Sequence, residues 1–319
     1  MVDEQVDLRI VSLIPSATEI VAALGYGDYL VGRSHECDYP ASVRDLPVCT
    51  EPKFDPVGTS AQIHSRVSEL LTSALSVYRV NTELLAKLRP THIITQAQCE
   101  VCAVSLSDVE GAVTELMETT FKGLAGPPVK IVSLQPERLA DVWTDMERVA
   151  EAFKRHIASP VSETEIIDSL KARLPKENFS EQPRPKVVCV EWTDPLMAAG
   201  NWVPELVHFA GGQDCLGKAG DHSDWMSWED FRAADPDIVV VMPCGYGMAK
   251  TREATAEMAN NPTWKGLKAV QNNQVYIVDG NQYFNRPGPR LVESYEILAE
   301  IIQGKEIDLA RHIVGWERF

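Results

Sequence analysis

Five short apolar segments of the chain each run directly into a cluster of reactive or aromatic side chains. The segments and the strand-end clusters that follow them are Leu30–Ser34 with His35–Tyr39, Ile93–Gln96 with Gln98–Cys102, Val187–Val190 with Glu191–Trp192, Ile238–Met242 with Pro243–Tyr246, and Val275–Asp279 with Asn281–Arg286. Apolar runs of this length predict buried strands, and in open α/β sheets ligands bind beyond the carboxyl ends of the strands. The repetition therefore predicts an α/β protein whose five clusters face one ligand.

The length of 319 residues, of which 45% are hydrophobic, predicts two lobes, because single cores stop growing near roughly 250–300 residues. The 30 Lys and Arg residues stand against 46 Asp and Glu residues, a net charge of -16. This charge argues against nucleic acid or an anionic membrane surface as the partner. No apolar run approaches the roughly 20 residues of a spanning helix, and the acidic residues 1–7 do not resemble a signal peptide. We therefore expect a cytoplasmic protein without a membrane span.

Strand and helix patterns alternate along the first part of the chain. Residues 9–14 read as a strand, and Ser16 followed by Glu19 fits a capping box at the start of a helix that Gly25 and Gly27 end. Further strands are expected at 30–34, 92–96 and 129–134, and helices near 60–88 and 106–121. Such alternation predicts a parallel sheet with helical crossovers, so residues 8–136 are expected to form an N-terminal α/β lobe.

Apolar positions from Leu139 to Phe153 keep helical spacing, and no Gly or Pro interrupts them before Pro160. We therefore expect 137–175 to form a long backbone helix, in one piece or two collinear pieces, that joins the lobes. Residues 184–304 are expected to form a C-terminal α/β lobe with strands at 186–191, 238–242 and 275–279 and helices at 203–210, 228–233 and 291–302. The charged tail beyond Gly304 is expected to cap the surface.

Five short motifs occur in an order and spacing typical of a known family. They are Pro15–Glu19, Asp38–Pro40, Leu88–Pro90, Ala210–Gly212 and Ala234–Asp237. From Leu8 to Ile302 the sequence resembles the helical-backbone (class III) substrate-binding proteins of iron-siderophore and vitamin B12 ABC importers, and most closely the vitamin B12-binding members. The resemblance implies a ligand cleft between two lobes, and it implies binding rather than catalysis.

The resemblance also implies which residues line the cleft. Carried over position by position, they are His35, Glu36, Cys37, Asp38, Tyr39, Gln98, Cys99, Glu100, Cys102, Trp192, Asn201, Trp202, Trp225, Tyr283, Phe284, Asn285 and Arg286. A flat corrin ring suits aromatic faces with polar amide groups at the rim, so cobalamin or a related corrinoid is the expected ligand. His35, and after it His222, are the candidates to sit over the corrinoid cobalt, because neutral imidazole is a common metal ligand.

Two departures from the family pattern bear on where the protein acts. The chain shows no export signal, and an importer's binding protein works outside the membrane. Of the two acidic residues expected to dock on a permease, Glu100 is present, but Asn285 occupies the second position. Both departures argue against docking on an ABC permease and favour a cytosolic corrinoid carrier or sensor.

Two alternatives remain open. Cys99 and Cys102, with Cys37 and His35, offer soft ligands for zinc, iron or an iron–sulfur cluster, although a lone Cys-x-x-Cys is also typical of packed thiols. A thiol-dependent enzyme would use Cys99 or Cys102 as nucleophile with His35 as its base. The chain carries no Gly-x-Ser-x-Gly, Walker or His-Glu-x-x-His motif, so a binding protein rather than an enzyme is the main expectation.

Overall fold

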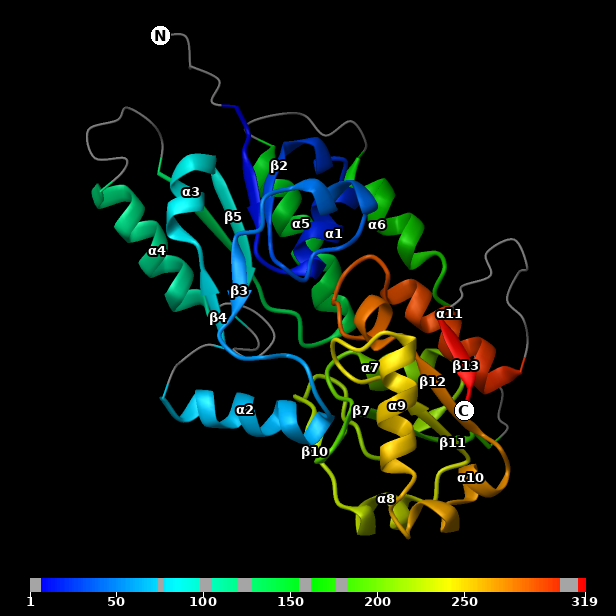
Figure 1. The fold of residues 1–319 in the computed structure, drawn as a ribbon. Helices are drawn as coiled ribbons and strands as arrows, with labels where there is room; N and C mark the ends of the chain where they lie inside the picture. The colour runs from blue at the N-terminus through cyan, green and yellow to red at the C-terminus, as the bar shows by residue number, and fades with distance from the viewer. Residues whose placement is uncertain are drawn as a thin grey trace. The chain divides into compact units, whose positions relative to one another are not determined.

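The computed structural model describes residues 7–73, 77–97, 105–119, 128–154, 162–175, 183–304 and 315–319 (Figure 1). The chain divides into two compact units. Unit 1 consists of Met1–Val57, Ser65–Pro136 and Ala140–Ser169, and unit 2 consists of Gly58–His64, Glu137–Leu139 and Leu170–Phe319. Each unit combines a β-sheet with surrounding helices, which confirms the predicted α/β class.

Unit 1 is built on a four-stranded parallel sheet in the order β2-β1-β5-β6. The strands are β1 (Ile10–Ser12), β2 (Leu30–Arg33), β5 (His92–Gln96) and β6 (Lys130–Leu134). All four predicted strands of this region are confirmed. The central strands are buried, with Val11 and Ile93 fully so, because the inner strands of a parallel sheet are covered on both faces.

The first helix of unit 1 begins without the predicted cap. Helix α1 (Pro15–Ala23) has no side-chain hydrogen bond at its N-cap, so the capping box predicted from Ser16 and Glu19 is wrong. Both of these residues are buried, and Pro15 starts the helix because its fixed φ suits the first turn. Gly25, at a φ of 84°, follows the helix end as predicted.

The predicted helix over 60–88 is interrupted. The structure has α2 (Ser60–Ser73), then β4 (Tyr78–Val80), then α3 (Thr82–Leu88), and β4 pairs antiparallel with β3 (Thr50–Pro52). Tyr78 and Val80 in β4 favour a strand over a helix. The side chain of Asn81 caps α3 by accepting from the amide of Leu84, and left-handed Arg89 ends it.

The remaining helices of this region are α4 (Leu106–Thr119), α5 (Leu139–Phe153) and α6 (Glu163–Lys171). The predicted linking segment 137–175 therefore contains two helices, α5 and α6, while residues 155–161 lie outside the described residues. The apolar stripe of α5 is buried as its spacing predicts, including Val142, Met146 and Phe153.

Unit 2 has a mixed sheet in the order β10-β8-β7-β11-β12-β13, with β9 paired to β7. Its strands are β7 (Lys186–Thr193), β8 (Leu196–Ala198), β9 (Gln213–Asp214), β10 (Asp224–Trp225), β11 (Ile238–Val241), β12 (Val275–Val278) and β13 (Trp316–Arg318). The three predicted strands, β7, β11 and β12, are confirmed and run parallel to one another.

The helices of unit 2 are α7 (Val203–Phe209), α8 (Trp228–Ala234), α9 (Met248–Met258), α10 (Lys268–Gln271) and α11 (Leu291–Gln303), with a 3-10 turn at Trp264–Gly266 and a π-helical turn at Gly280–Phe284. A capping box between Ser227 and Asp230 starts α8. The described end of the tail beyond Gly304 forms β13 against β12, and the expectation that the tail caps the surface stays a prediction.

Each unit has its own core. In unit 1 the largest side chains of the cluster around β1 and β5 include Leu13, Leu85 and Ile93, and in unit 2 the cluster around β7, β11 and β12 includes Phe231 and Ile277. Among the described residues, no helix combines the length and the apolar character needed to cross a membrane.

Candidate functional site

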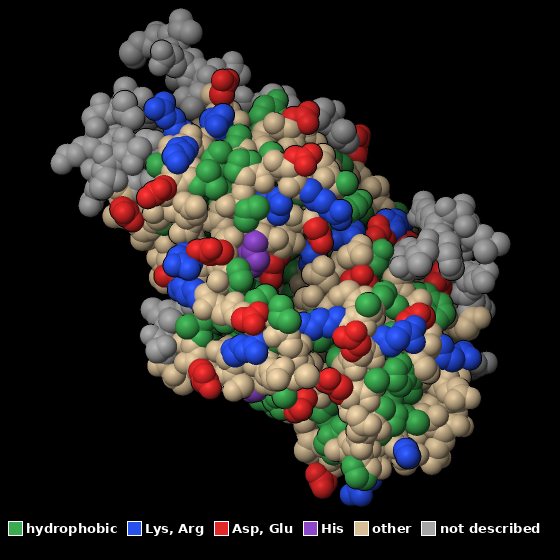
Figure 2. Space-filling model, viewed as in Figure 1, with side chains coloured by type: hydrophobic (Ala, Val, Ile, Leu, Met, Phe, Trp, Pro, Cys, Tyr) green, Lys and Arg blue, Asp and Glu red, His purple; other side chains and the backbone are tan. Residues whose placement is uncertain are grey.

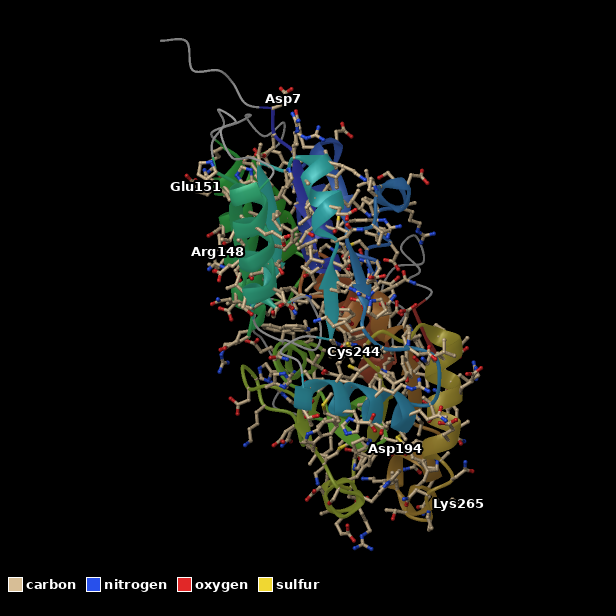
Figure 3. The ribbon with its side chains drawn as sticks, turned by 60° about the vertical axis from the view of Figure 1, so that its left-hand side comes forward. Asp7, Arg148, Glu151, Asp194, Cys244 and Lys265 are labelled. Carbon is tan, nitrogen blue, oxygen red and sulfur yellow. The ribbon has the colours of Figure 1, made fainter. Side chains whose placement is uncertain are left out.

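In unit 2, three of the strand-end clusters meet at one edge of the sheet. Because β7, β11 and β12 are adjacent and parallel, their carboxyl ends lie together. The amide of Cys244 donates to the carbonyl of Glu191 at 3.2 Å, and the amide of Asn281 donates to the carbonyl of Tyr246 at 3.1 Å. Figure 3 shows Cys244 and Lys265, which lies in the turn before α10, at opposite ends of the unit. The clusters after β7, β11 and β12 therefore lie at one edge, while the prediction that all five clusters face one ligand stays a prediction.

An aromatic surface lies at this carboxyl edge of unit 2. Trp192 is half-buried, and its ring centroid lies 5.2 Å from that of buried Tyr246. The ammonium of Lys250 lies 4.2 Å from the centroid of the Tyr246 ring, a cation–π distance. Burial raises the pKa of Tyr246 and lowers the pKa of Lys250. The edge thus combines ring faces with a cation.

The first turn of α2 belongs to unit 2 and brings two further side chains to this edge. Ser60 Oγ lies 2.7 Å from Thr193 Oγ1 and 3.3 Å from Tyr246 Oη, and all three residues are buried. The ring of His64 meets Trp225 edge-on at a centroid distance of 5.2 Å, and Trp225 is 55% exposed. Ser60 and His64 were not predicted from the sequence. Ser60 contacts Thr193, which is 133 positions away, and a local sequence pattern does not indicate such a contact.

Three other predicted residues lie on the turns beside β8 and β10. Asn201 adopts a left-handed φ of 51°, which Asn tolerates better than most residues. Trp202 is 6% exposed, and its indole N–H donates to the carbonyl of Phe284 at 2.9 Å. His222 is exposed, and its Nδ1 lies 3.1 Å from the carbonyl oxygen of Ser223. Trp202 therefore supports a loop from inside unit 2, whereas His222 faces solvent.

The predicted residues after β12 hold their own loop together. Tyr283 is half-buried and Phe284 is fully buried. The Asn285 amide donates to two backbone carbonyls at 3.0 Å each. Arg286 is 4% exposed and donates to Asn281 Oδ1 at 3.0 Å. These side chains fix the shape of the loop, and their direct contact with a ligand stays a prediction.

Carboxylates also stand at the carboxyl edge of unit 2. Glu191 accepts from the hydroxyl of Ser223 at 2.8 Å, and Asp279 accepts from the backbone and side-chain nitrogens of Gln282 at 2.8 and 2.9 Å. On the face seen in Figure 2, acidic and basic side chains are interspersed without a continuous basic patch. With a net charge of -16 for the chain, a neutral or cationic ligand is favoured over a polyanion.

In unit 1, the cluster after β2 is held by hydrogen bonds from neighbouring segments. His35 Nδ1 lies 2.8 Å from Thr50 Oγ1, and its ring centroid lies 5.1 Å from that of Tyr78. Burial, followed by the charge of Arg33, lowers the pKa of His35, so its imidazole is neutral at pH 7. Glu36 Oε1 accepts from the hydroxyl of Tyr78 at 3.2 Å. A neutral imidazole retains the lone pair that a metal ligand needs.

The rest of this cluster ranges from buried to exposed. Cys37 is buried and accepts a hydrogen bond from Thr18 Oγ1 at 3.0 Å. Asp38 is half-buried, and Tyr39 is 48% exposed. The predicted residues after β5 lie outside the described residues, namely Gln98, Cys99, Glu100 and Cys102.

The metal alternative depends on those same cysteines. Within the described ranges, no group of three or more His, Cys, Asp or Glu side chains is placed to hold a metal ion. The described cysteines are free thiols, at positions Cys37, Cys49, Cys189, Cys215 and Cys244. A zinc, iron or cluster site at Cys37, Cys99, Cys102 and His35 therefore stays a prediction, as does a thiol enzyme.

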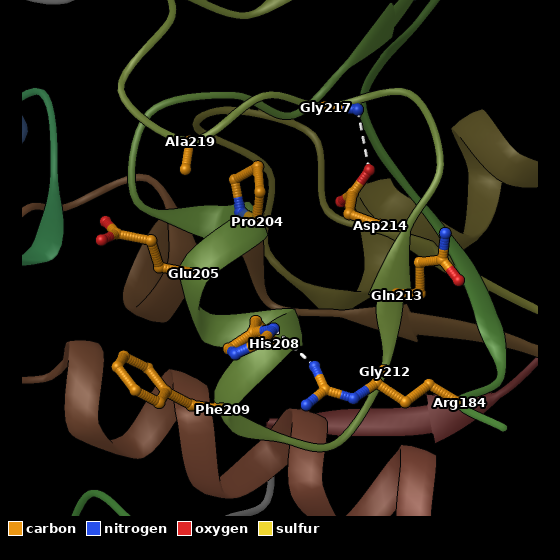
Figure 4. A pocket seen from close by; sticks show the side chains of 10 residues that line it. All are labelled: Arg184, Pro204, Glu205, His208, Phe209, Gly212, Gln213, Asp214, Gly217 and Ala219. Carbon is orange, nitrogen blue, oxygen red and sulfur yellow. Dashed lines mark hydrogen bonds between the residues drawn. The ribbon is translucent and has the colours of Figure 1, made fainter. Parts of the chain in front are cut away.

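A surface hollow of about 550 Å³ lies elsewhere on unit 2 (Figure 4). The pairing of β9 with the first residues of β7 places it near the amino end of that strand. Arg184 is hydrogen-bonded to His208, and Asp214 accepts from the amide of Gly217 at 2.7 Å. Burial raises the pKa of Asp214 to about 6. None of the predicted site residues lines this hollow.

Parallel strands whose carboxyl ends carry aromatic and polar clusters, present in both units, define a ligand-binding protein of the two-lobe α/β class. The chain belongs to the periplasmic binding protein family, whose model matches residues 10–281. This finding confirms the family resemblance seen in the sequence. The particular closeness to vitamin B12-binding members stays a prediction.

Known proteins share the fold over most of the chain. An uncharacterized ABC transporter substrate-binding lipoprotein, YvrC of Bacillus subtilis, is 26% identical over 302 residues, which cover 92% of this chain and 79% of the relative. The periplasmic vitamin B12 binding protein BtuF of Vibrio cholerae superposes with a TM-score of 0.60 at 19% identity, covering 94% of this chain and 98% of that one. A periplasmic heme binding protein from Pseudomonas aeruginosa gives a TM-score of 0.62 at 18% identity, covering 93% of each chain.

Proposed function

We propose that the protein binds a corrinoid, cobalamin or a close relative, as a substrate-binding protein rather than as an enzyme. The observation that carries the proposal is the aromatic surface at the carboxyl edge of unit 2, where Trp192 is half-buried and Trp225 is 55% exposed. Exposed ring faces at the end of a parallel sheet suit a large flat ligand. Membership of a family of binding proteins supports the same conclusion.

The charge of the site favours a corrinoid over haem. Haem carries two carboxylates, which call for available cations, whereas the corrin ring is decorated with neutral amides. At this edge Arg286 is buried and bonded to Asn281, and Arg290 is buried against the ring of Tyr283. Among the described residues of this edge, Lys250, which lies over the Tyr246 ring, is then a single cation for the two haem carboxylates. The net charge of -16 also disfavours an anionic ligand. Haem is the second candidate, because a heme binding protein shares the fold.

The protein's role would be to capture the ligand and pass it on. The relative from Bacillus subtilis is named as an ABC transporter component, so a permease is one receiver to test. The expectation of a cytosolic carrier or sensor that does not dock on a permease stays a prediction. Fractionation of source cells with an antibody against this chain tests the location, and co-purification with a permease tests the docking.

The proposal is tested by calorimetric titration of the whole protein with cobalamin, cobinamide and hemin. We expect a 1:1 complex with the two corrinoids and weaker binding of hemin. Replacement of Trp225 by Ala should weaken corrinoid binding by about 1–3 kcal/mol, because an exposed ring face that the bound ligand would cover is lost. Leu71→Ala is the control, since Leu71 is 38% exposed on α2. Tight binding of hemin without binding of a corrinoid would show that haem, not a corrinoid, is the ligand. Binding of neither would refute the proposal.

A further inference from the structure

The last five residues of the chain are bonded to β12 along its whole length. Strand β13 pairs antiparallel with β12, and Figure 1 shows it, in red, beside that strand. The amide of Phe319 donates to the carbonyl of Val275 at 2.9 Å. The indole N–H of Trp316 donates to Glu300 of α11 at 2.7 Å, and Arg252 of α9 pairs with Glu317. Backbone and side chains therefore fix the segment 315–319 in one register.

This C-terminal segment also contacts the loop that follows β12. The amide of Asp279, the first residue of that loop, donates to the carbonyl of Gly315 at 2.8 Å. A Cβ atom at position 315 would lie 2.5 Å from Cε2 of Tyr283 and 3.1 Å from Cδ1 of Ile297. The Tyr283 ring thus rests directly on the backbone of Gly315, and any side chain at this position would force the ring to shift.

The opposite side of the same loop is fixed by the turn that follows β11. A Cβ atom on Gly280 would lie 2.4 Å from the carbonyl oxygen of Pro243, and the amide of Asn281 donates to the carbonyl of Tyr246 at 3.1 Å. Residues 279–286 are therefore held between the end of β11 and the C-terminal segment. The position of the loop therefore depends on two supports. One is the turn after the parallel strand β11, and the other is the C-terminal segment, whose strand β13 runs antiparallel to β12.

We infer that Gly315 and the C-terminal segment 315–319 are positioning elements for the ligand-binding loop 279–286. This inference rests on the proposed function, since that function places the loop at the ligand site. Gly315 acts through Tyr283: close packing of the ring on the backbone orders the loop before the ligand arrives. A loop ordered in advance binds more tightly, because less conformational entropy is lost on binding.

The test compares Gly315→Val with Gly266→Val in the full-length protein. A Cβ at Gly266 meets nothing within 4 Å, so this control adds the same side chain at an exposed position whose Cβ has no close neighbour. We expect Gly315→Val to raise hydrogen–deuterium exchange in 279–286 and to weaken corrinoid binding about tenfold or more, whereas Gly266→Val changes neither. If Gly315→Val does not fold, Gly315→Ala adds only the colliding Cβ and serves in its place.

A double-mutant cycle with Tyr283→Ala tests the route of the effect. If the ring transmits the collision, the Gly315 substitution should weaken binding less in the Tyr283→Ala background than in the wild type. An undiminished effect in that background, or unchanged exchange of the loop in Gly315→Val, would overturn the inference. If the wild-type protein binds neither corrinoid nor hemin, the proposed function fails, and the exchange measurement still decides whether Gly315 positions the loop.

Discussion

Trp202 provides a sharp test of how the unit 2 site is supported. Its indole N–H donates to the carbonyl of Phe284 at 2.9 Å, and both residues are buried. In Trp202→Phe the carbonyl loses its partner, which costs about 1–3 kcal/mol for a buried polar group. The smaller ring adds a cavity cost on the order of 1 kcal/mol. We therefore expect the free energy of unfolding to fall by about 2–4 kcal/mol.

The assay is urea denaturation followed by intrinsic fluorescence and by circular dichroism, with the two probes compared to check that unit 2 unfolds in one step. Trp225→Phe is the matched control, because Trp225 is 55% exposed, and surface substitutions change stability within about 0.5 kcal/mol. A Trp202→Phe midpoint equal to that of the wild type, at an unchanged slope, would refute the assignment of Trp202 as an internal support.

Three further outcomes are expected. Ser60→Ala should lower the stability of unit 2 by about 1–3 kcal/mol in the same assay, because the buried hydroxyl of Thr193 loses its partner at 2.7 Å; no change would contradict this. Burial raises the pKa of Asp145 from 3.8 to about 6, so the neutral carboxyl stabilises the fold below pH 3.8 and this contribution is lost as the pH rises through 6. Between pH 4 and 7 the wild type should therefore lose up to about 3 kcal/mol of unfolding free energy relative to Asp145→Asn, and a difference that does not vary with pH would contradict the argument. Burial also raises the pKa of Cys189, so mass spectrometry after brief alkylation of the native protein should find Cys189 unmodified and half-exposed Cys244 labelled, and the reverse order would contradict the structure.

The main parallel strands, β1, β2, β5 and β6 in unit 1 and β7, β11 and β12 in unit 2, were predictable because they read as continuous apolar runs. The short strands β8, β9 and β10 were not predicted. Strand β13 was not predicted either, since Trp316–Arg318 is short and carries two charged residues. Strand β13 forms because β12 would otherwise be an unpaired edge of the sheet. The sequence of the tail alone gives no sign of that edge. The capping box at Ser16 failed for a related reason: the spacing was right, but Pro15 had already set the first turn and both side chains were buried.

The sequence predicted that the candidate site lies at the ends of strands, but not which side chains are exposed there. Trp192 and Trp225 lie at the carboxyl edge of unit 2 with exposed surface, as their place after strands suggests. Phe284 and Trp202 were predicted from the same kind of position, near the end of a strand, yet both side chains are buried inside unit 2. A linear pattern tells which residues reach the edge, but it does not tell whether a side chain points outward or into the core.

Binding of a corrinoid by this chain is tested most simply by retention on a desalting column. The purified protein is mixed with a twofold excess of cobalamin, passed through the column, and its absorbance spectrum is recorded together with its cobalt content. If the chain binds a corrinoid, a corrin spectrum elutes with the protein at one cobalt per chain. A protein fraction that emerges without corrin absorbance or cobalt, from a sample shown to be folded, would contradict corrinoid binding.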